Sequence, residues 1–227
     1  MYGKQLAVWS CGRIQSTRCP NKMLRPFHDS TLTDIFLSKL AELESDVFFA
    51  GYEPVFQEKC QKHGVPFVQR TQESAEIDGP ASLVYSFLDS QPYEYMLCVN
   101  ACLPFLKTST IVTFLERCAE EDMKPCMGVI KRNNFFVDLD GQPLNFPGDL
   151  RLMNTKTVTP VHEFANALYF FRKADFLKLG FWWDFQEVRY VELASGIEMF
   201  DIDTEDDFSA AEAMWNGLGA GAMGSAD

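Results

Sequence analysis

The chain has 227 residues, of which 47% are hydrophobic and 23% charged, a composition typical of a globular domain rather than of a disordered chain. It has 32 acidic and 20 basic side chains, and the net charge of −12 argues against nucleic acid or an anionic membrane as a partner. The charge is uneven: residues 1–28 contain five basic and no acidic side chains, and residues 190–227 contain nine acidic side chains and no Lys or Arg.

Short apolar runs alternate with amphipathic segments through the first 130 residues. We predict buried strands at residues 6–11, 47–50, 65–68, 95–99 and 127–130. Helices are expected between them at residues 31–44, 54–62, 81–88 and 110–118. This alternation predicts an α/β fold with a Rossmann-like, mostly parallel sheet and helices on both faces. Ligands of such sheets bind beyond the carboxyl ends of the strands, which makes the polar segment 12–25 a candidate site.

The alternation breaks at residues 133–162, where we predict a β-hairpin insertion of the kind that often serves dimerisation or covers a site as a lid. Residues 135–139 and 144–146 would be its strands, joined by the turn Asp140-Gly141. The pattern then resumes with strands at 167–171, 188–193 and 198–202 and helices at 174–179 and 205–215. We therefore expect one domain, residues 1–217, which includes the insertion, and a flexible tail at 218–227.

The sequence contains seven cysteines, an odd number. No two of them have the spacing of a zinc knuckle or a thioredoxin-like redox site. Several lie in apolar runs, where a free thiol behaves as a small hydrophobic group, so a reducing compartment is expected. No basic-then-apolar leader pattern opens the sequence, and Asn100 interrupts the longest apolar run. We expect a soluble, cytoplasmic protein.

The segment after the first predicted strand is basic. Residues 12–22 read Gly-Arg-Ile-Gln-Ser-Thr-Arg-Cys-Pro-Asn-Lys. The guanidinium groups and the ammonium group suit a polyphosphate, and the backbone N–H groups of such a loop can surround one. A solvated loop whose charges bind nothing is an equal alternative on this pattern alone.

Two carboxylates, Asp201 and Asp203, alternate along a late predicted strand. Side chains at i and i+2 of a strand point the same way, so the pair can share Mg²⁺, which takes one or two carboxylates together with phosphate oxygens and water. Charge complementarity to a helix N-terminus is the alternative for Asp203, but not for Asp201, which lies in an apolar run. An EF-hand spacing also fits, but Asp206 stands where that loop requires Gly.

These motifs together resemble the acylneuraminate cytidylyltransferase family, the CMP-sialic acid synthetases and their relatives. The family's Ala-Arg-x-x-Ser-x-x-x-Pro-x-Lys is similar to residues 12–22, with Gly12 in place of Ala. Its Asp-Ile-Asp-Thr-x-x-Asp-Leu is similar to residues 201–208, and its Gln-Pro-Thr-Ser-Pro-Leu-Arg is loosely similar to residues 100–107. The resemblance covers residues 5–215 and implies the nucleotidyltransferase fold.

The resemblance assigns roles to individual residues. It implies that Arg13 and Lys22 are catalytic and that Asp201 and Asp203 hold Mg²⁺ as the cofactor. The nucleotide CTP would be bound by a larger set, namely Arg13, Ser16, Lys22, Arg70, Ser82 and Asn100. The acceptor would be bound by Asn100, Lys107, Asn166 and Tyr169.

The reaction implied is transfer of CMP from CTP to an acidic acceptor, a sialic-type nonulosonic acid, with release of pyrophosphate. The residues that match the acceptor-binding motif depart from it: Lys107 lies one position after the family's Arg, and the Arg before Asn166 is lost. A phosphonate or another anionic acceptor is therefore an alternative, as is a non-catalytic nucleotide-binding relative. The resemblance also implies a homodimer.

Overall fold

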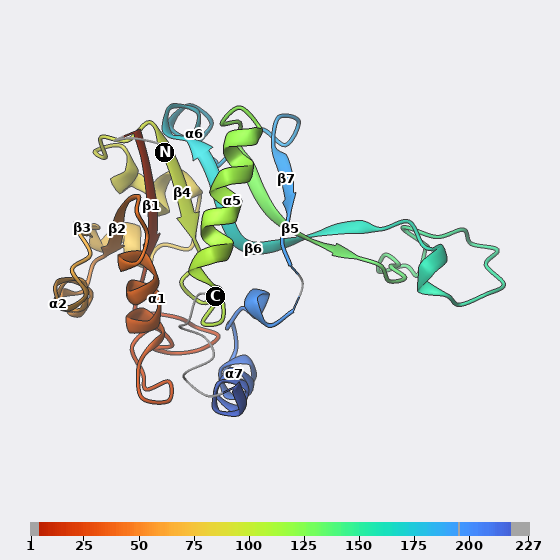
Figure 1. The fold of residues 1–227 in the computed structure, drawn as a ribbon, viewed down its shortest axis with the longest axis horizontal. Helices are drawn as coiled ribbons and strands as arrows, with labels where there is room; N and C mark the ends of the chain where they lie inside the picture. Colours follow the sequence, from red (N-terminus) through yellow and green to blue (C-terminus); the bar gives the residue numbers. More distant parts are fainter. Residues whose placement is uncertain (1–4, 195, 219–227) are drawn as a thin grey trace.

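A seven-stranded sheet forms the centre of the computed structural model, which describes residues 5–194 and 196–218 (Figure 1). The strands are β1 (Leu6–Cys11), β2 (Asp46–Gly51), β3 (Phe67–Gln69), β4 (Tyr95–Val99), β5 (Cys126–Arg132), β6 (Val161–Arg172) and β7 (Arg189–Glu192). Their order across the sheet is β3-β2-β1-β4-β6-β5-β7, and every pairing is parallel except the two made by β6. The mostly parallel sheet is thus confirmed.

Helices cover both faces of this sheet. Successive side chains of a strand face opposite sides, so Leu6 and Val8 enter one apolar core and Ala7 and Trp9 enter the other. The first core is completed by α1 (Leu32–Ala41), α2 (Pro54–His63), α5 (Thr108–Glu120) and α7 (Glu205–Leu218). The second is completed by α4 (Ala81–Val84), the 3₁₀ turn η2 (Ser86–Leu88) and α6 (Lys173–Leu179). Figure 1 shows α5 crossing in front of the sheet and α7 below it.

Local signals fix several helix ends as expected. The hydroxyl of Thr31 accepts a hydrogen bond from the Asp34 N–H at the start of α1, and Thr204 does the same for Asp207 before α7. Gly64 and Gly180 end α2 and α6 with φ of +69°, a left-handed conformation that glycine adopts without steric cost. Within the described ranges no helix is long and apolar enough to cross a membrane.

The helix predicted at residues 81–88 is broken into α4 and η2. Tyr85 and Phe87 both contact Trp9, with ring centroids 5.5 and 5.4 Å away. An α-helix would not direct residues two positions apart to the same neighbour, so packing against Trp9 overrides the helical pattern. A short helix that the periodicity did not predict, α3 (Gln72–Glu76), precedes it.

The strand predicted at residues 198–202 does not form. Glu198 lies in the 3₁₀ turn η4 (Ile197–Met199), which is closed by a hydrogen bond from the Phe200 N–H to the Ile197 carbonyl. The N–H of Ile202 then donates to the carbonyl of Cys102, in the loop after β4, at 3.1 Å. The segment therefore crosses the end of the sheet instead of pairing with a strand, and strand alternation does not position Asp201 and Asp203.

The insertion between β5 and β6 is the tip of a long arm that projects from the body (Figure 1). Strands β5 and β6 are antiparallel and stay paired out to Arg132 and Val161. Beyond them the expected hairpin is reduced to one bridge, Val137 with Pro143, and a 3₁₀ turn, η3 (Thr155–Thr157). The buried side chain of Asn145 accepts from the Phe136 N–H and donates to the carbonyls of Asn134 and Thr159, at 2.7–2.9 Å. These bonds order the tip without a ladder.

Candidate active site

The loop between β1 and α1 is ordered by backbone contacts at its start. The N–H of Gly12 donates to the Ala50 carbonyl at 3.0 Å, and the N–H of Ile14 donates to the Glu53 carboxylate at 3.1 Å. A Cβ on Gly12 would come within 2.9 Å of ring carbons of Phe49 and Phe56. These two rings therefore explain why Gly stands where the resembled motif has Ala.

A cavity of about 430 Å³ opens beside this loop, beyond the carboxyl ends of β1, β3 and β4, where the topology predicts a site. One part of its wall is basic and hydroxylated: Arg13, Ser16, Thr17, Arg18 and Lys22. The remaining lining is Cys11, Gly12, Met23, Arg70, Ala75, Asp78, Gly79, Val84, Tyr85 and Cys102. Four of the predicted nucleotide-binding residues, Arg13, Ser16, Lys22 and Arg70, thus share one cavity.

Lys22 is the most enclosed cation of the basic wall. Its Nζ donates to the carbonyl of Ile202 and lies 3.3 Å from Oδ1 of Asp203. Burial disfavours its charge, but its neighbours Cys102 and Asp203 outweigh that effect, so the pKa of Lys22 is raised. The ammonium group therefore stays charged beside the cavity.

Asp201 is a half-buried carboxylate with incomplete hydrogen bonding. Its Oδ2 accepts from Nδ2 of Asn100 at 3.0 Å, whereas its buried Oδ1 has no partner within the described residues. Burial, and next the carboxylate of Asp203, raise the pKa of Asp201 to about 6. An anionic oxygen that lacks a donor suits a hard cation, so Asp201 and Asp203 fit the donor set that Mg²⁺ prefers.

The basic segment near the start of the chain and the acidic segment near its end meet beside this cavity. Arg18 makes a two-pronged ion pair with Asp203, at 2.9 and 3.1 Å, and Arg25 pairs with Glu205 at 2.8 Å. On the opposite rim Arg13 pairs with Asp78 at 2.7 Å. The roles that the resemblance implies do not include Arg18, although its place inside the basic motif was a signal that could have included it.

No group of three or more His, Cys, Asp or Glu side chains able to hold a metal occurs in the described part of the chain. This does not conflict with the magnesium prediction, because Mg²⁺ in nucleotide sites takes one or two protein carboxylates and completes its shell with phosphate oxygens and water. Asp201 and Asp203 would supply two such carboxylates.

The predicted acceptor residues Asn100, Asn166 and Tyr169 lie together next to Asp201. Nδ2 of Asn100 donates to the Asn166 carbonyl at 2.9 Å, and the Tyr169 hydroxyl donates to Oδ1 of Asn166 at 3.3 Å. Asn166 has a φ of +50°, at the point where the register of β5 and β6 shifts. This irregularity places its carbonyl within reach of Asn100.

Other predicted residues lie elsewhere. Ser82 is exposed on α4, near Gly180, and is absent from the described residues that line the cavity. Lys107 lies 3.7 Å from Glu198, whose carboxylate also accepts from the Lys107 N–H and the Thr110 hydroxyl. Lys107 is held at the start of α5 by Glu198, a long-range contact that the loose match of the middle motif did not reveal.

Solved structures with the same fold cover almost the whole chain at low identity. One is a CMP:2-keto-3-deoxy-manno-octonic acid synthetase complexed with CTP, with a TM-score of 0.68, 11% identity and coverage of 92% of this chain and 98% of that one. Another is the 4-diphosphocytidyl-2C-methyl-D-erythritol synthase of Anaerococcus prevotii, with a TM-score of 0.63, 13% identity and coverage of 93% and 96%. A cytidylyltransferase of Leptospira borgpetersenii has a TM-score of 0.61, 12% identity and coverage of 92% and 85%.

No curated protein matches the sequence. A family model described as cytidylyltransferase matches residues 11–212, a range that begins at the last residue of β1 and ends in α7. The match includes both charged motifs that the fold brings to the cavity. The chain belongs to the cytidylyltransferase family, whose members are nucleotidyltransferases that use CTP.

Proposed function

We propose that the chain is a Mg²⁺-dependent cytidylyltransferase that transfers CMP from CTP to an acidic acceptor of the sialic, nonulosonic type. The observation that carries the proposal is the pairing of Arg18 and Lys22, two basic residues of the cavity wall, with Asp203, which lies two positions after Asp201. The fold shared with a synthetase named for CMP and an octonic acid favours an acidic sugar as acceptor. A phosphonate or another anionic acceptor is the alternative.

The basic wall would bind the triphosphate. Arg13, Arg18 and Lys22 offer charged donors and Ser16 a hydroxyl within the same wall. Arg13 and Arg18 would exchange their present partners, Asp78 and Asp203, for phosphate oxygens, which are also anionic. Because phosphoryl transfer depends on positioning and charge neutralisation, this set needs no protein nucleophile.

The acceptor would lie on the other side of Asp201, along Asn100, Asn166 and Tyr169. An acceptor oxygen would form a bond to the α-phosphorus while the bond between that phosphorus and the pyrophosphate oxygen breaks. Asp201 and Asp203 would hold the magnesium ion, which supplies neutralisation of the phosphate charge when bound. Asn100 donates hydrogen bonds to Asp201 and to the Asn166 carbonyl. It would therefore hold the nucleotide-binding and acceptor-binding parts of the site in a fixed relative position.

The experiment that tests the function measures pyrophosphate release from CTP and Mg²⁺ with acidic sugars in one panel and phosphonates in a second. Turnover with an acidic sugar supports the proposal. Turnover with phosphonates alone would mean that the acceptor is a phosphonate and not an acidic sugar. CTP binding without turnover on either panel identifies a non-catalytic relative and overturns the enzymatic proposal.

Lys22→Ala is expected to lower pyrophosphate release by about 10²- to 10³-fold, since it removes an enclosed charge from the phosphate-binding wall. The readout is the steady-state rate with saturating acceptor. Lys124→Ala, which removes an exposed charge far from the cavity, is the matched control and should leave the rate unchanged. An unaltered rate in Lys22→Ala would show that Lys22 is not part of the site.

We also propose that the arm joins two copies of the chain. Its tip exposes large apolar side chains, and Leu139 is fully exposed. The others are Val137, Leu144, Leu152 and Met153. Exposed apolar area of this kind is usual at protein interfaces. The double variant Leu139→Ser, Met153→Ser should shift sedimentation from dimer to monomer at micromolar concentration, and a wild-type monomer would contradict the proposal.

A further inference from the structure

The cavity has two chemically different parts. The basic wall suits a polyphosphate. The rest is mostly apolar and includes Cys11, Ala75, Gly79, Val84 and Tyr85 around Arg70, with one acid, Asp78, which is paired with Arg13. A pyrimidine nucleotide has the same division, with a polyanionic end and a flat ring that carries a few polar atoms. The apolar part is therefore the place for the base.

Tyr85 is held rigidly in this part of the wall. Its ring lies 4.7 Å from that of Trp182 and 5.5 Å from that of Trp9. Its hydroxyl makes no hydrogen bond with any residue of the described ranges. Its polar neighbours are the thiols of Cys11 and Cys98, the guanidinium of Arg70 and the hydroxyl of Tyr169, which donates to Asn166 instead. Thiols are weak hydrogen-bonding groups, so the hydroxyl keeps its capacity to donate and accept. Burial raises the pKa of Tyr85, which keeps the phenol neutral.

Arg70 is fixed beside Tyr85 by its own bonds. Its Nε donates to the Ser74 hydroxyl at 3.2 Å, and its Nη2 donates to the carbonyls of Ser74 and Val84. Its Nη1 makes no hydrogen bond with a residue in the described part. Two groups of fixed position, the Tyr85 hydroxyl and Nη1 of Arg70, thus have unused capacity within the apolar part of the cavity.

We infer that the Tyr85 hydroxyl hydrogen-bonds the pyrimidine base of the nucleotide and is a binding residue of this enzyme. This rests on the proposed function, since it requires a cytidine nucleotide in the cavity. Arg70 can only donate, so it favours a ring acceptor such as N3 of cytosine over the N–H of uracil. A hydroxyl can donate or accept, so Tyr85 adds affinity without selecting between the two bases.

The test compares binding of CTP and of inorganic triphosphate, which has no base, by calorimetry in Mg²⁺. Tyr85→Phe keeps the ring and removes only the hydroxyl. It should raise the Kd of CTP about tenfold, the usual effect of losing one such bond, and that of UTP by the same factor. The Kd of triphosphate should not change. Tyr93→Phe is the matched control, because Tyr93 packs on Phe48 in the same core but does not line the cavity.

Three outcomes would overturn the assignment. An unchanged Kd of CTP in Tyr85→Phe shows that the hydroxyl does not bind the nucleotide. Equal weakening of CTP and triphosphate shows a distorted cavity rather than a lost base contact. If Tyr85→Phe raises the Kd of CTP but not that of 2′-deoxycytidine triphosphate, the Tyr85 hydroxyl bonds the ribose 2′-hydroxyl and not the base. Failure of the wild-type protein to bind CTP would instead refute the proposed function, and with it this assignment.

Discussion

Asp201→Asn is expected to reduce pyrophosphate release at least 10³-fold while it increases the stability of the folded protein. The amide can still accept from Asn100, so the local geometry is kept, but the charge offered to Mg²⁺ is lost. The wild-type carboxylate is costly in the metal-free protein, because burial and Asp203 raise its pKa from 3.8 to about 6. Removing that cost should add about 1–2 kcal/mol to the free energy of unfolding at pH 8, measured in urea without Mg²⁺.

The pH dependence of the stability gained in Asp201→Asn follows from the raised pKa of Asp201 in the folded protein. A carboxyl whose pKa is higher in the folded state binds its proton more tightly there, so its charge destabilises the fold progressively as the pH rises from about 4 past 6. The difference between Asp201→Asn and the wild type should therefore vanish near pH 4. Asp206→Asn, an exposed acid in the first turn of α7, is the control and should change neither property. Equal activity of Asp201→Asn and wild type would remove Asp201 from the proposed metal site.

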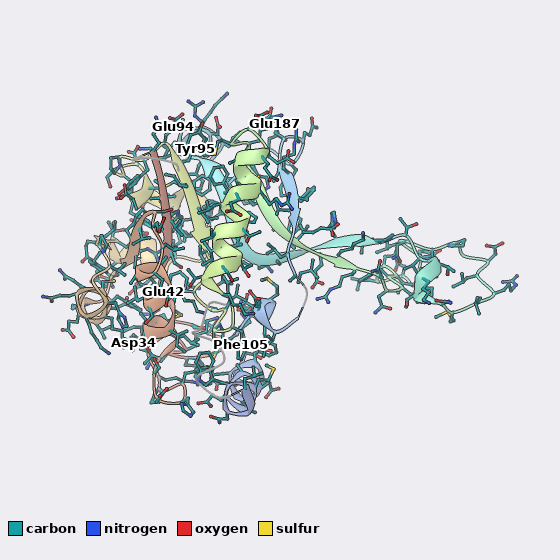
Figure 2. The ribbon with its side chains drawn as sticks, viewed as in Figure 1. Asp34, Glu42, Glu94, Tyr95, Phe105 and Glu187 are labelled. Atoms are coloured by element: carbon teal, nitrogen blue, oxygen red, sulfur yellow. The ribbon has the colours of Figure 1, made fainter. Side chains whose placement is uncertain are left out.

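Asp34→Asn should have the largest effect on stability, about 2–4 kcal/mol in the free energy of unfolding, with little change in catalysis. Asp34 is buried on α1, on the side that faces α2 (Figure 2), and its carboxylate lies 2.5 Å from Nζ of Lys59 and 2.9 Å from Nε2 of His63. It also accepts from the Thr31 hydroxyl at 2.7 Å. The variant leaves Lys59 beside α1 without its carboxylate partner, and urea unfolding at pH 7 measures the cost.

The pH dependence of the Asp34 effect has the opposite sign. Burial opposes the charge, but the bonds from Lys59, Thr31 and His63 outweigh it, so the pKa of Asp34 is held well below its usual 3.8. The stabilising contribution is complete above about pH 4 and is lost as the pH falls further, so variant and wild type should converge in acid. Lys62→Ala, at the exposed edge of the same network, should cost only about 0.5 kcal/mol or less. A similar loss in both variants would mean that Asp34 has no special role.

The sequence predicted the sheet because its signals are local. The runs at β1 and β4 are almost entirely apolar, as is typical of strands buried on both faces. The glycines Gly64 and Gly180 mark the ends of α2 and α6. The basic loop could also be assigned, since it follows a buried strand whose carboxyl end lies at the ligand edge of such a sheet. Neither inference needed a contact between distant residues.

What the sequence could not predict depends on such contacts. Residues 198–202 have an apolar pattern that suits a strand, but the hydrogen bond from Ile202 to Cys102 turns them across the sheet. The basic motif contains Arg18, but its pairing with Asp203, 185 residues away in the chain, is a contact that no local pattern predicts. The outer half of β6 is polar and exposed because it forms the arm, so its composition did not indicate a strand.

The ion pairs between the basic loop and the last helix region also determine when the site can exist. Arg18 and Lys22 are made early by the ribosome, whereas Asp203 and Glu205 are made near the end of the described chain. Until those last residues emerge, the nascent protein can form β1 and α1, but the basic wall of the cavity lacks the carboxylates that pair with it, and closure over so many residues is slow. The acidic half of the site is therefore acquired at the end of synthesis, and fragments that end before residue 200 should fold in part but release no pyrophosphate from CTP.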